Sequence, residues 1–553
     1  MSPGSTSLLS GSGHRLFCSR WLHRRVPATH REELLHILRM TGPLLLSRIL
    51  NYLLPFVVTM FCGRLGNEVM AGYGLACATI NVTTTATGYG LILACDTLVS
   101  QTFGGKNLLR VGVILQRGVI ILLLFCLPCW GLLINAQVIL LCVGQNPEVA
   151  MFLHHLQVSY LQNQGIILPQ MYAAAMANVA NVVTNYTFLY WLDLGVSGSA
   201  AANALAQIYI STFLFAFIWW KKLHVMTWRG WSVESLQEWG SFMKLAIPST
   251  LMKCFEWWVY ELGGFFAGML SEDELAAQHA VIMVAFITYM FPLGIQAAAC
   301  ARVGNALGAG DSARAVLTAK VALTLAGSIA VVEGAVLSST KTVIGFIFTS
   351  DEKIIGLVSH LMNAYLFALC HQKHGVCTGI FLGTGKQKIP AVANFIGYYC
   401  IGLSLSITLM FVAKLRVLGF WLGLLVCVIL QSTLYIIVIF NLNWERMTEE
   451  TASNGSSVDG YMSVSTECPD GSAEPRGGVQ QLKGGGLSTT QLILRRGLTM
   501  FAAVSLLAVG ATVHFLVPLP EIASANFTTD RINATNTPDS IFSTVLLPTE
   551  ESE

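Results

Sequence analysis

Charged residues are scarce in this 553-residue chain: only 11% of its residues are Asp, Glu, Lys or Arg, whereas 54% are hydrophobic. Soluble globular proteins carry about 25% charged residues, because their surfaces face water. A deficit of this size indicates that most of the folded surface faces something other than water, which argues against a soluble enzyme. The sequence also has no block of basic residues, so we expect no binding to nucleic acid.

Motifs for metal binding, disulfide frameworks and hydrolytic catalysis are missing as well. The 14 cysteines lie mainly inside apolar runs, and the CxxC pair of Cys126 and Cys129 has no second pair that would complete a zinc site. The sequence contains no HExxH pattern and no GxSxG pattern. We therefore expect no cofactor, no metal and no enzymatic activity.

Long hydrophobic runs are present instead. A transmembrane helix needs about 20 predominantly apolar residues, and a window of that length predicts thirteen spans in this chain. A polar turn, Gln162–Gln164, and Pro169 separate two of these runs. The predicted spans lie near 40–61, 70–98, 111–134, 150–170, 171–192, 198–220, 243–270, 276–300, 315–337, 355–380, 389–413, 418–440 and 498–517.

Lys and Arg are concentrated in alternate loops between these spans. Loops rich in Lys and Arg remain in the cytoplasm, and this bias predicts a cytoplasmic N-terminus. An odd number of spans then predicts an extracellular C-terminus. Asn526 and Asn533 begin N-glycosylation patterns in that tail, which agrees with the predicted orientation.

The two halves of the chain repeat each other weakly. Composition alone can align two apolar helices, but the matched residues here fall at predicted helix ends and in the same order. The pairs are Pro43 with Pro248, Gly104 with Gly308, Arg110 with Arg314, Pro169 with Pro390 and, after a three-residue slip, Gly195 with Gly419. Parallel repeats of six helices enclose a central substrate site that alternates between the two membrane faces. The repeat therefore favours a carrier over a channel.

The predicted organisation follows from these patterns. Residues 443–490 are rich in Gly, Ser, Glu and Thr and poor in apolar residues, which is typical of a flexible linker. The segments we expect are a cytoplasmic N-terminal segment 1–38, an N-lobe 39–222, a C-lobe 240–442, a flexible cytoplasmic linker 443–496, a thirteenth span 497–518 and an extracellular tail 519–553.

A few ionisable residues fall inside the predicted spans, where charges are costly and usually functional. Glu256 and Glu261 lie on one predicted helix, and their directions diverge by about 140° because they are five residues apart. Tyr260 shares a face with Glu256, and Trp257 shares a face with Glu261. A carboxylate beside an aromatic ring suits a bulky organic cation through charge attraction and cation–π contact.

The same acids can couple transport to a proton gradient. Burial disfavours the charged form of a carboxyl group, so an acid that holds either a proton or a cation exchanges one for the other. Alternatives remain: Lys253 can form a structural ion pair with Glu256, and Asp96 can cap a helix or pair with a basic loop. Aromatic residues such as Trp257 also occur at membrane interfaces for general reasons.

Several stretches make the chain similar to the multidrug and toxin extrusion (MATE) family, and to its vertebrate branch in particular. The resemblance covers roughly residues 35–445. The stretches are Phe61–Gly66, Ala94–Gln101, Gly112–Arg117, Leu245–Ser249, Glu256–Trp258, Arg302–Gly310 and Asn441–Trp444. The resemblance implies an all-α polytopic membrane protein, with a twelve-helix core in two pseudo-symmetric six-helix lobes and a thirteenth C-terminal transmembrane helix.

The resemblance also implies a function and a set of site residues. The function is proton-coupled antiport of organic cations and cationic drugs at the plasma membrane. By position, Glu256, Glu261 and Asn81 match residues that bind protons or substrate in this family. We expect the partners to be small organic cations, protons and the lipid bilayer, and we expect the chain to act as a monomer.

The sequence departs from the family at two positions. Close vertebrate relatives carry further acids where this chain has Met283 and His371. His371 can titrate near neutral pH or can be an ordinary core histidine, and Asp96 is a further accessory candidate. Two other functions remain open, a sodium-coupled multidrug exporter and a lipid-flippase-like transporter of the same architecture.

Overall fold

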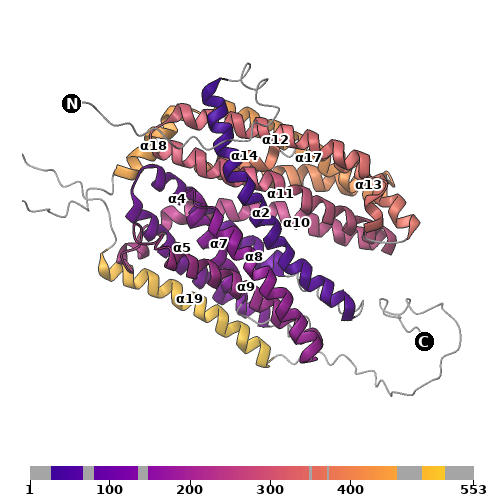
Figure 1. Cartoon of the computed structure of the whole chain (residues 1–553), viewed down its shortest axis with the longest axis horizontal. Helices are drawn as coiled ribbons and strands as arrows, with labels where there is room; N and C mark the ends of the chain where they lie inside the picture. The colour runs from indigo at the N-terminus through magenta and orange to yellow at the C-terminus, as the bar shows by residue number, and fades with distance from the viewer. Residues whose placement is uncertain are drawn as a thin grey trace, which may run out of the picture.

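The computed structural model describes residues 27–65, 80–134, 147–347, 351–369, 373–456 and 488–516. Within these residues every regular element is a helix, which confirms the predicted all-α class. Figure 1 shows most helices running roughly alongside one another, with the C-terminal half in the upper part, most of the N-terminal half below it, and α2 crossing from one half to the other. His371, Asn526 and Asn533 lie outside the described residues.

The N-terminal half runs from α2 to α9. Two of its helices include a π-helical turn, η1 before α4 and η2 after α8. The elements are α2 (Ala28–Leu65), η1 (Asn81–Thr85), α4 (Ala86–Gly104), α5 (Leu108–Ile134), α7 (Pro147–Asn163), α8 (Leu168–Tyr186), η2 (Thr187–Trp191) and α9 (Gly195–Trp220). The turn at residues 164–167 separates α7 from α8, as the polar Gln162–Gln164 stretch predicts.

The C-terminal half runs from α10 to α17, and two further helices follow it. The elements of this half are η3 (Val233–Leu236), α10 (Trp239–Leu270), α11 (Glu272–Gly308), α12 (Ser312–Thr340), η4 (Ile344–Ile347), α13 (Glu352–Leu369), α14 (Lys373–Thr384), α15 (Lys388–Asn394), η5 (Phe395–Leu403), α16 (Ser404–Ile407), η6 (Thr408–Val412) and α17 (Arg416–Asn441). The two helices that follow are α18 (Trp444–Ser456) and α19 (Thr489–Leu516).

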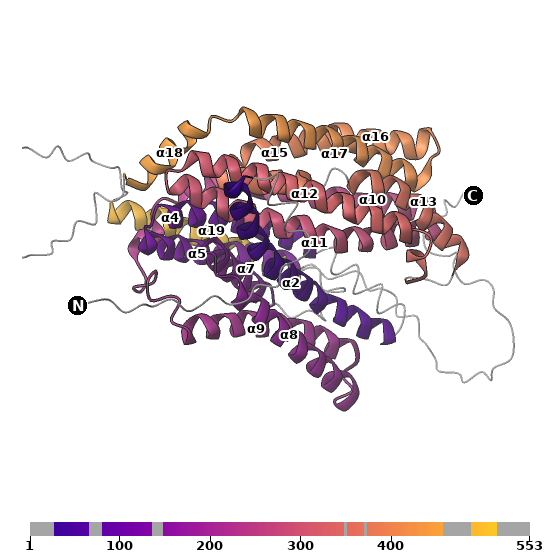
Figure 2. The same cartoon turned by 45° about the horizontal axis from the view of Figure 1, so that its top comes forward.

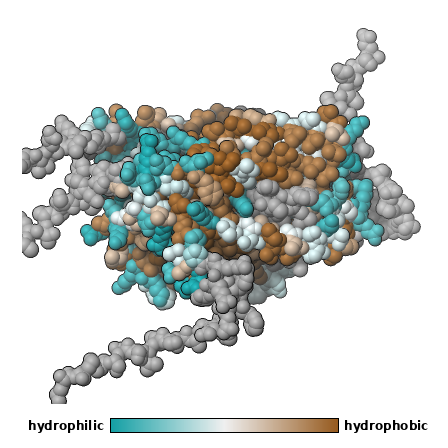
Figure 3. All heavy atoms as spheres, turned by 90° about the horizontal axis from the view of Figure 1, so that it is seen from above, coloured by the Kyte–Doolittle hydropathy of each residue, from teal (hydrophilic) through white to brown (hydrophobic). Residues whose placement is uncertain are grey.

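The outer surface of this bundle is apolar. Hydrophobic residues cover much of the middle of the face in Figure 3, and hydrophilic residues gather toward its two ends. Seven helices of the described part are long and apolar enough to cross a membrane. This distribution fits a multi-pass membrane protein, since lipid tails contact an apolar belt. The count of thirteen spans stays a prediction.

The turns after α4 and α11 are built alike, 204 residues apart. Lys106 and Gly310 both have left-handed backbone, with φ of 63° and 82°. Asn107 and Asp311 then each accept a hydrogen bond at the start of the next helix, from the backbone N–H three residues further on, at 3.1 and 2.9 Å. Matching turns at matching positions support the internal repeat.

A second pair of turns corrects the alignment of the repeat near its end. Asp193 and Lys414 both have left-handed backbone, and the chain enters α9 and α17 through the same hydrogen bonds. In the first turn the N–H of Gly198 donates a hydrogen bond to the Leu194 carbonyl. In the second turn the N–H of Gly419 donates the equivalent bond to the Leu415 carbonyl. Gly419 therefore corresponds to Gly198, and the predicted three-residue slip is wrong. A Cβ at either glycine would collide with the turn before it, which explains why glycine stands at both.

Helices α4 and α11 occupy equivalent positions in the two halves, and they cross at a contact formed by equivalent residues of each. A Cβ on Gly104 would lie 2.1 Å from the Asn305 carbonyl oxygen, and one on Gly308 would lie 1.9 Å from that of Gln101. Residues 101 and 104 are related to 305 and 308 by the same offset of 204. The crossing thus lies on the pseudo-twofold axis, and it requires glycine on both helices.

Hydrogen bonds hold the two halves together near this crossing. The Thr97 hydroxyl donates to the Leu382 carbonyl at 2.7 Å, and the Gln101 side-chain amide donates to the Gly383 carbonyl at 2.9 Å. The side chains come from α4 and the carbonyls from α14. The halves are therefore closed against each other at this end of the bundle.

Helix α18 falls in the segment predicted to be a flexible linker, so this part of the prediction is wrong. Trp444 and Met447 are buried in the core of the C-terminal half, and the Trp444 indole donates to the Ile439 carbonyl. The polar composition of 443–490 as a whole concealed this short apolar stripe. Helix α19 likewise begins at Thr489, eight residues before the predicted start of the last span.

We expect the glycine crossing to be sensitive to any added side chain. Gly308→Val should lower the melting temperature of the purified protein clearly, because overpacking a close contact costs about 1–3 kcal/mol or more. Gly334→Val is the matched control, since nothing lies within 4 Å of a Cβ at Gly334 in α12. Equal melting temperatures for the two variants would contradict the close crossing.

Candidate functional site

Glu256 lies in the middle of α10 and is buried, with 6% of its surface exposed. The Lys253 ammonium, one helical turn away, donates to Oε2 at 2.8 Å. The Tyr289 hydroxyl, from α11, donates to Oε1 at 2.8 Å. Both carboxylate oxygens therefore have a partner, as a buried carboxylate requires. The ion pair that the sequence left open as an alternative is present.

Aromatic and polar side chains of the C-terminal half surround this pair. His374, from α14, lies close enough to interact electrostatically with Glu256 and stacks on Tyr435 with ring centroids 4.9 Å apart. The Tyr435 hydroxyl donates to Asn394 at 2.7 Å. Neither ring nitrogen of His374 has a hydrogen-bond partner in the part of the chain that the structure describes. The buried side of α10 is thus polar as well as aromatic.

The neighbouring side of α10 faces the N-terminal half. Trp257 stacks on Tyr89 of α4, with ring centroids 5.9 Å apart and an interplanar angle of 22°. The Trp258 indole donates to the Val82 carbonyl in η1 at 3.0 Å. These contacts are specific, so the two tryptophans are more than general interface aromatics. They bring the site helix against the π-helical turn that begins at Asn81.

Glu261 differs from Glu256 in its surroundings. Its side chain is exposed and makes no hydrogen bond or ion pair with any residue that the structure describes. It lies three and four residues beyond Trp258 and Trp257, which places it on the same side of α10. The helix therefore carries one buried, paired carboxylate and one exposed carboxylate, pointing in different directions as the five-residue spacing predicts.

The other predicted site residues are not all brought together. Tyr260 is partly buried and packs against the core of the C-terminal half. Asn81 is exposed at the start of η1, next to the carbonyl that Trp258 contacts. Asp96 lies within the N-terminal half, where Ser159 and Asn163 of α7 each donate to its Oδ1 at 2.7 Å.

Asp96 and Met283 lie in surroundings that differ from those of Glu256. The two side chains of α7 that bond Asp96 show that it is held within the N-terminal half. Met283 lies on α11 and its sulfur accepts a hydrogen bond from the Tyr52 hydroxyl of α2 at 3.4 Å. A thioether carries no charge, so this position adds no carboxylate to the site. His371 lies outside the described residues.

Tyr289 and His374 were missed by the sequence analysis. Formal charge inside an apolar span is the signal that singles out Glu256 and Glu261, and a tyrosine carries no such charge. Tyr289 is 33 residues from Glu256 and His374 is on a helix still further along the chain. A hydroxyl and an imidazole in apolar helices are visible in the sequence, but the hydrogen bond from Tyr289 to Glu256 is not.

Chemically, α10 offers a carboxylate that already holds a cation. In this state the Lys253 ammonium occupies the place on Glu256 that a proton or a substrate cation would take. Glu261, which has no partner among the described residues, is exposed one helical turn beyond Trp257, whose ring stacks on Tyr89 of the N-terminal half. Within the described residues no group of three or more His, Cys, Asp or Glu could hold a metal ion.

Comparison with known proteins gives a consistent result. The family model described as MatE matches residues 43–187 and 248–408. The two matched segments begin 205 residues apart, which is the offset of Pro43 and Pro248 in the repeat. Multidrug and toxin extrusion protein 1 of Danio rerio is 43% identical to this chain over 92% of the chain and 95% of the relative. Multidrug and toxin extrusion protein 2 of Mus musculus is 46% identical over 76% of each.

Solved structures share the fold. The crystal structure of the eukaryotic MATE transporter AtDTX14 covers 77% of this chain and all of its own, with a TM-score of 0.72 and 24% identity. A multidrug resistance MATE family transporter solved in an outward-facing conformation covers 75% of this chain, with a TM-score of 0.66 and 16% identity. Because both identities are low, these likenesses concern the fold alone.

The ion pair makes a specific stability prediction. Lys253→Met should lower the melting temperature strongly, because breaking a buried pair leaves an uncompensated charge that costs about 3–5 kcal/mol. The double variant Lys253→Met/Glu256→Gln removes both charges and should recover most of the loss. A double variant no more stable than Lys253→Met would contradict the pairing.

Proposed function

Because the chain belongs to the MATE family of multi-pass membrane transporters, we propose that it exports organic cations, including cationic drugs, in exchange for protons. Membership of this family identifies the chain as a transporter. We therefore expect no enzymatic activity. The names of the zebrafish and mouse relatives refer to the extrusion of multiple drugs and toxins. The cationic substrate and the proton coupling are proposals from the site.

The observation that carries the proposal is the pair of carboxylates on α10. Glu256 is buried and paired, whereas Glu261 is exposed one helical turn beyond Trp257, which stacks on Tyr89 of the N-terminal half. A bulky cation gains charge attraction from a carboxylate and cation–π contact from an indole. We therefore assign Glu261 and Trp257 to the first contact with the substrate, and Glu256 to the exchange of substrate for a proton.

Lys253 supplies a physical link between protonation and movement. A proton on Glu256 neutralises the carboxylate and leaves the Lys253 ammonium buried without its counter-charge. An unpaired buried charge costs several kcal/mol, so protonation favours a conformation in which the ammonium reaches water or another acid. A ligand shifts a conformational equilibrium by its different affinity for the two states. The proton acts here as such a ligand.

The remaining candidates have supporting roles in this proposal. Tyr260 shares the face of Glu256, and Asn81 borders the contact between η1 and Trp258. Asp96, with its two donors from α7, is an accessory polar group of the N-terminal half. We further propose that the chain acts as a monomer in the plasma membrane, with its N-terminus in the cytoplasm and its C-terminus outside.

Transport by a Glu256 variant tests the proposal. In proteoliposomes with an imposed pH gradient, wild-type protein should move tetraethylammonium, and Glu256→Gln should lose at least about 90% of this flux, because glutamine neither binds a proton nor attracts a cation. The double variant Lys253→Met/Glu256→Gln should be inactive too, although its charges are balanced and it should fold. Glu272→Gln, an exposed acid at the start of α11, is the matched control and should transport normally.

Two results would overturn parts of the proposal. Normal pH-driven flux in a folded Lys253→Met/Glu256→Gln variant would reduce Glu256 to a structural residue. Flux in the wild type under a sodium gradient alone, with none under a pH gradient alone, would replace proton coupling by sodium coupling. Surface expression and melting temperature are measured for every variant, so that loss of folding is not read as loss of transport.

A further inference from the structure

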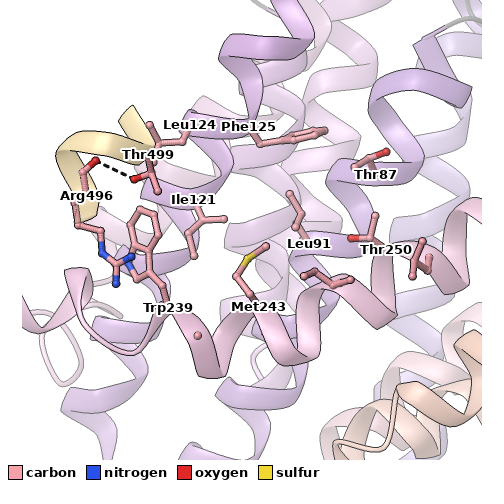
Figure 4. Close-up of a pocket in the computed structure, with 13 residues that line it drawn as sticks. Thr87, Leu91, Ile121, Leu124, Phe125, Trp239, Met243, Thr250, Arg496 and Thr499 are labelled. Carbon is pink, nitrogen blue, oxygen red and sulfur yellow. Dashed lines mark hydrogen bonds between the residues drawn. The ribbon is translucent and has the colours of Figure 1, made fainter. Parts of the chain in front are cut away.

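A groove of about 620 Å³ lies between α4, α5, α10 and α19, away from Glu256. Figure 4 shows it between the beginning of α10 and the beginning of α19. Most of its walls are apolar, from Leu91, Ile121, Leu124, Phe125, Met243 and Ile247. Thr87 and Thr250 lie at the end remote from Arg496. A groove of this volume is in the range of small-ligand sites.

The length of the groove matches one leaflet of a bilayer. Its lining on α10 begins at Trp239 and ends at Leu251, twelve residues further on. Twelve helical residues rise about 18 Å, and half of the hydrocarbon core is about 15 Å. An acyl chain that enters at the beginning of α10 therefore fits along the groove to its inner end.

Helix α19 forms the outer wall, and its position is fixed by close contacts. A Cβ on Gly510 would lie 2.3 Å from the Gly131 carbonyl oxygen of α5, so the two helices cross at small residues. At the other end of α19, the Arg496 guanidinium lies 4.0 Å from the centre of the Trp239 ring. Arg496 Nε also donates to the Leu236 carbonyl at 2.7 Å. Figures 1 and 2 place α19 beside α5.

The mouth of the groove is positively charged. The terminal nitrogens of Arg496 have no hydrogen-bond partner among the described residues, and Arg495 beside it is exposed. Lys244 is exposed on α10 next to the lining residue Met243 but is not itself part of the lining. It lies about 7.5 Å along the helix from Trp239, and its long side chain leans toward the start of α10 and so toward the mouth. It forms no ion pair with the residues that the structure describes.

Two acids, Glu234 and Glu238, lie near this mouth. Glu238, just before α10, forms ion pairs with Arg110 and Arg117 of α5 at 3.6 and 3.5 Å. Within the described residues neither acid forms an ion pair with Arg496 or Lys244. An apolar channel of one leaflet's depth with unpaired cations at the membrane surface is complementary to an anionic amphiphile. A substrate cation would be repelled at this entrance.

We propose that this groove binds one phospholipid with an anionic headgroup, taken from the leaflet in which α10 begins. One acyl chain lies along α10 behind α19, and the headgroup contacts Arg496 and Lys244. The walls come from α4 and α5 of the N-terminal half and from α10 of the C-terminal half. The bound lipid thus bridges the two halves and stabilises the arrangement in which they lie together at this end.

Lipid binding to the full-length purified protein tests the proposal directly. Native mass spectrometry and melting temperature are measured with phosphatidylglycerol and with phosphatidylcholine of the same acyl chains. Phosphatidylglycerol should bind and raise the melting temperature, and phosphatidylcholine should bind at least about tenfold more weakly, because a Lys or Arg near the surface contributes appreciably to anionic lipid binding.

Variants of the groove identify the site. Arg496→Gln/Lys244→Gln should weaken phosphatidylglycerol binding about tenfold or more. The matched control is Lys320→Gln/Lys388→Gln, which removes two exposed cations from α12 and α15 and should change nothing. Gly240→Leu keeps every charge and fills the groove, since nothing lies within 4 Å of a Cβ there, and it should abolish binding too.

Several outcomes would overturn the proposal. Equal binding of the two lipids would make the groove a site for any acyl chain or detergent. Unchanged phosphatidylglycerol binding in Gly240→Leu would place the lipid elsewhere on the surface. Loss of binding in Arg496→Gln/Lys244→Gln with a wild-type level in Gly240→Leu would reduce the interaction to surface charge.

Discussion

The contact between Glu256 and Lys253 is the interaction on which the proposed transport mechanism depends. Charges inside a membrane-embedded bundle are tolerated only when they are paired or hydrogen-bonded. Lys253 and Tyr289 each occupy one oxygen of the carboxylate. Any proton or cation that binds Glu256 must therefore displace a partner, and a displaced ammonium must find water or another acid. Exchange of ligands and movement of α10 are coupled by this requirement.

The site helix α10 contacts α4 far from the place where α4 crosses α11. Helices α4 and α11 meet on the pseudo-twofold axis at Gly104 and Gly308, where no side chain fits between them. Tyr89, which stacks on Trp257, lies fifteen residues up α4 from Gly104, or about 22 Å away. A small change of the angle between α4 and α11 at the glycine crossing would therefore displace Tyr89 by a large distance. Because Tyr89 stacks on Trp257, this displacement would act on the part of α10 that carries Trp257 and Glu261.

The sequence predicts the composition of the site better than its geometry. Apolar runs predict the helices, and the three-residue spacing of Lys253 and Glu256 allows the ion pair that the structure shows. The contact of Tyr289 with Glu256 depends on the packing of α11 against α10, which no local pattern encodes. The exposure of Glu261 depends on which face of α10 meets the N-terminal half. Helix α18 was missed because Trp444 and Met447 are a local exception in a polar segment.

The central claim is that a proton and an organic cation compete for Glu256, and proton release measures this competition most directly. Purified protein is first acidified until Glu256 takes up a proton in place of the Lys253 ammonium; it is then held in weakly buffered detergent solution with a pH indicator, and tetraethylammonium is added. The account predicts that cation binding releases protons from the wild type and that the folded variant Lys253→Met/Glu256→Gln releases fewer or none. Cation binding to the wild type without any proton release, or equal release by both proteins, would contradict it.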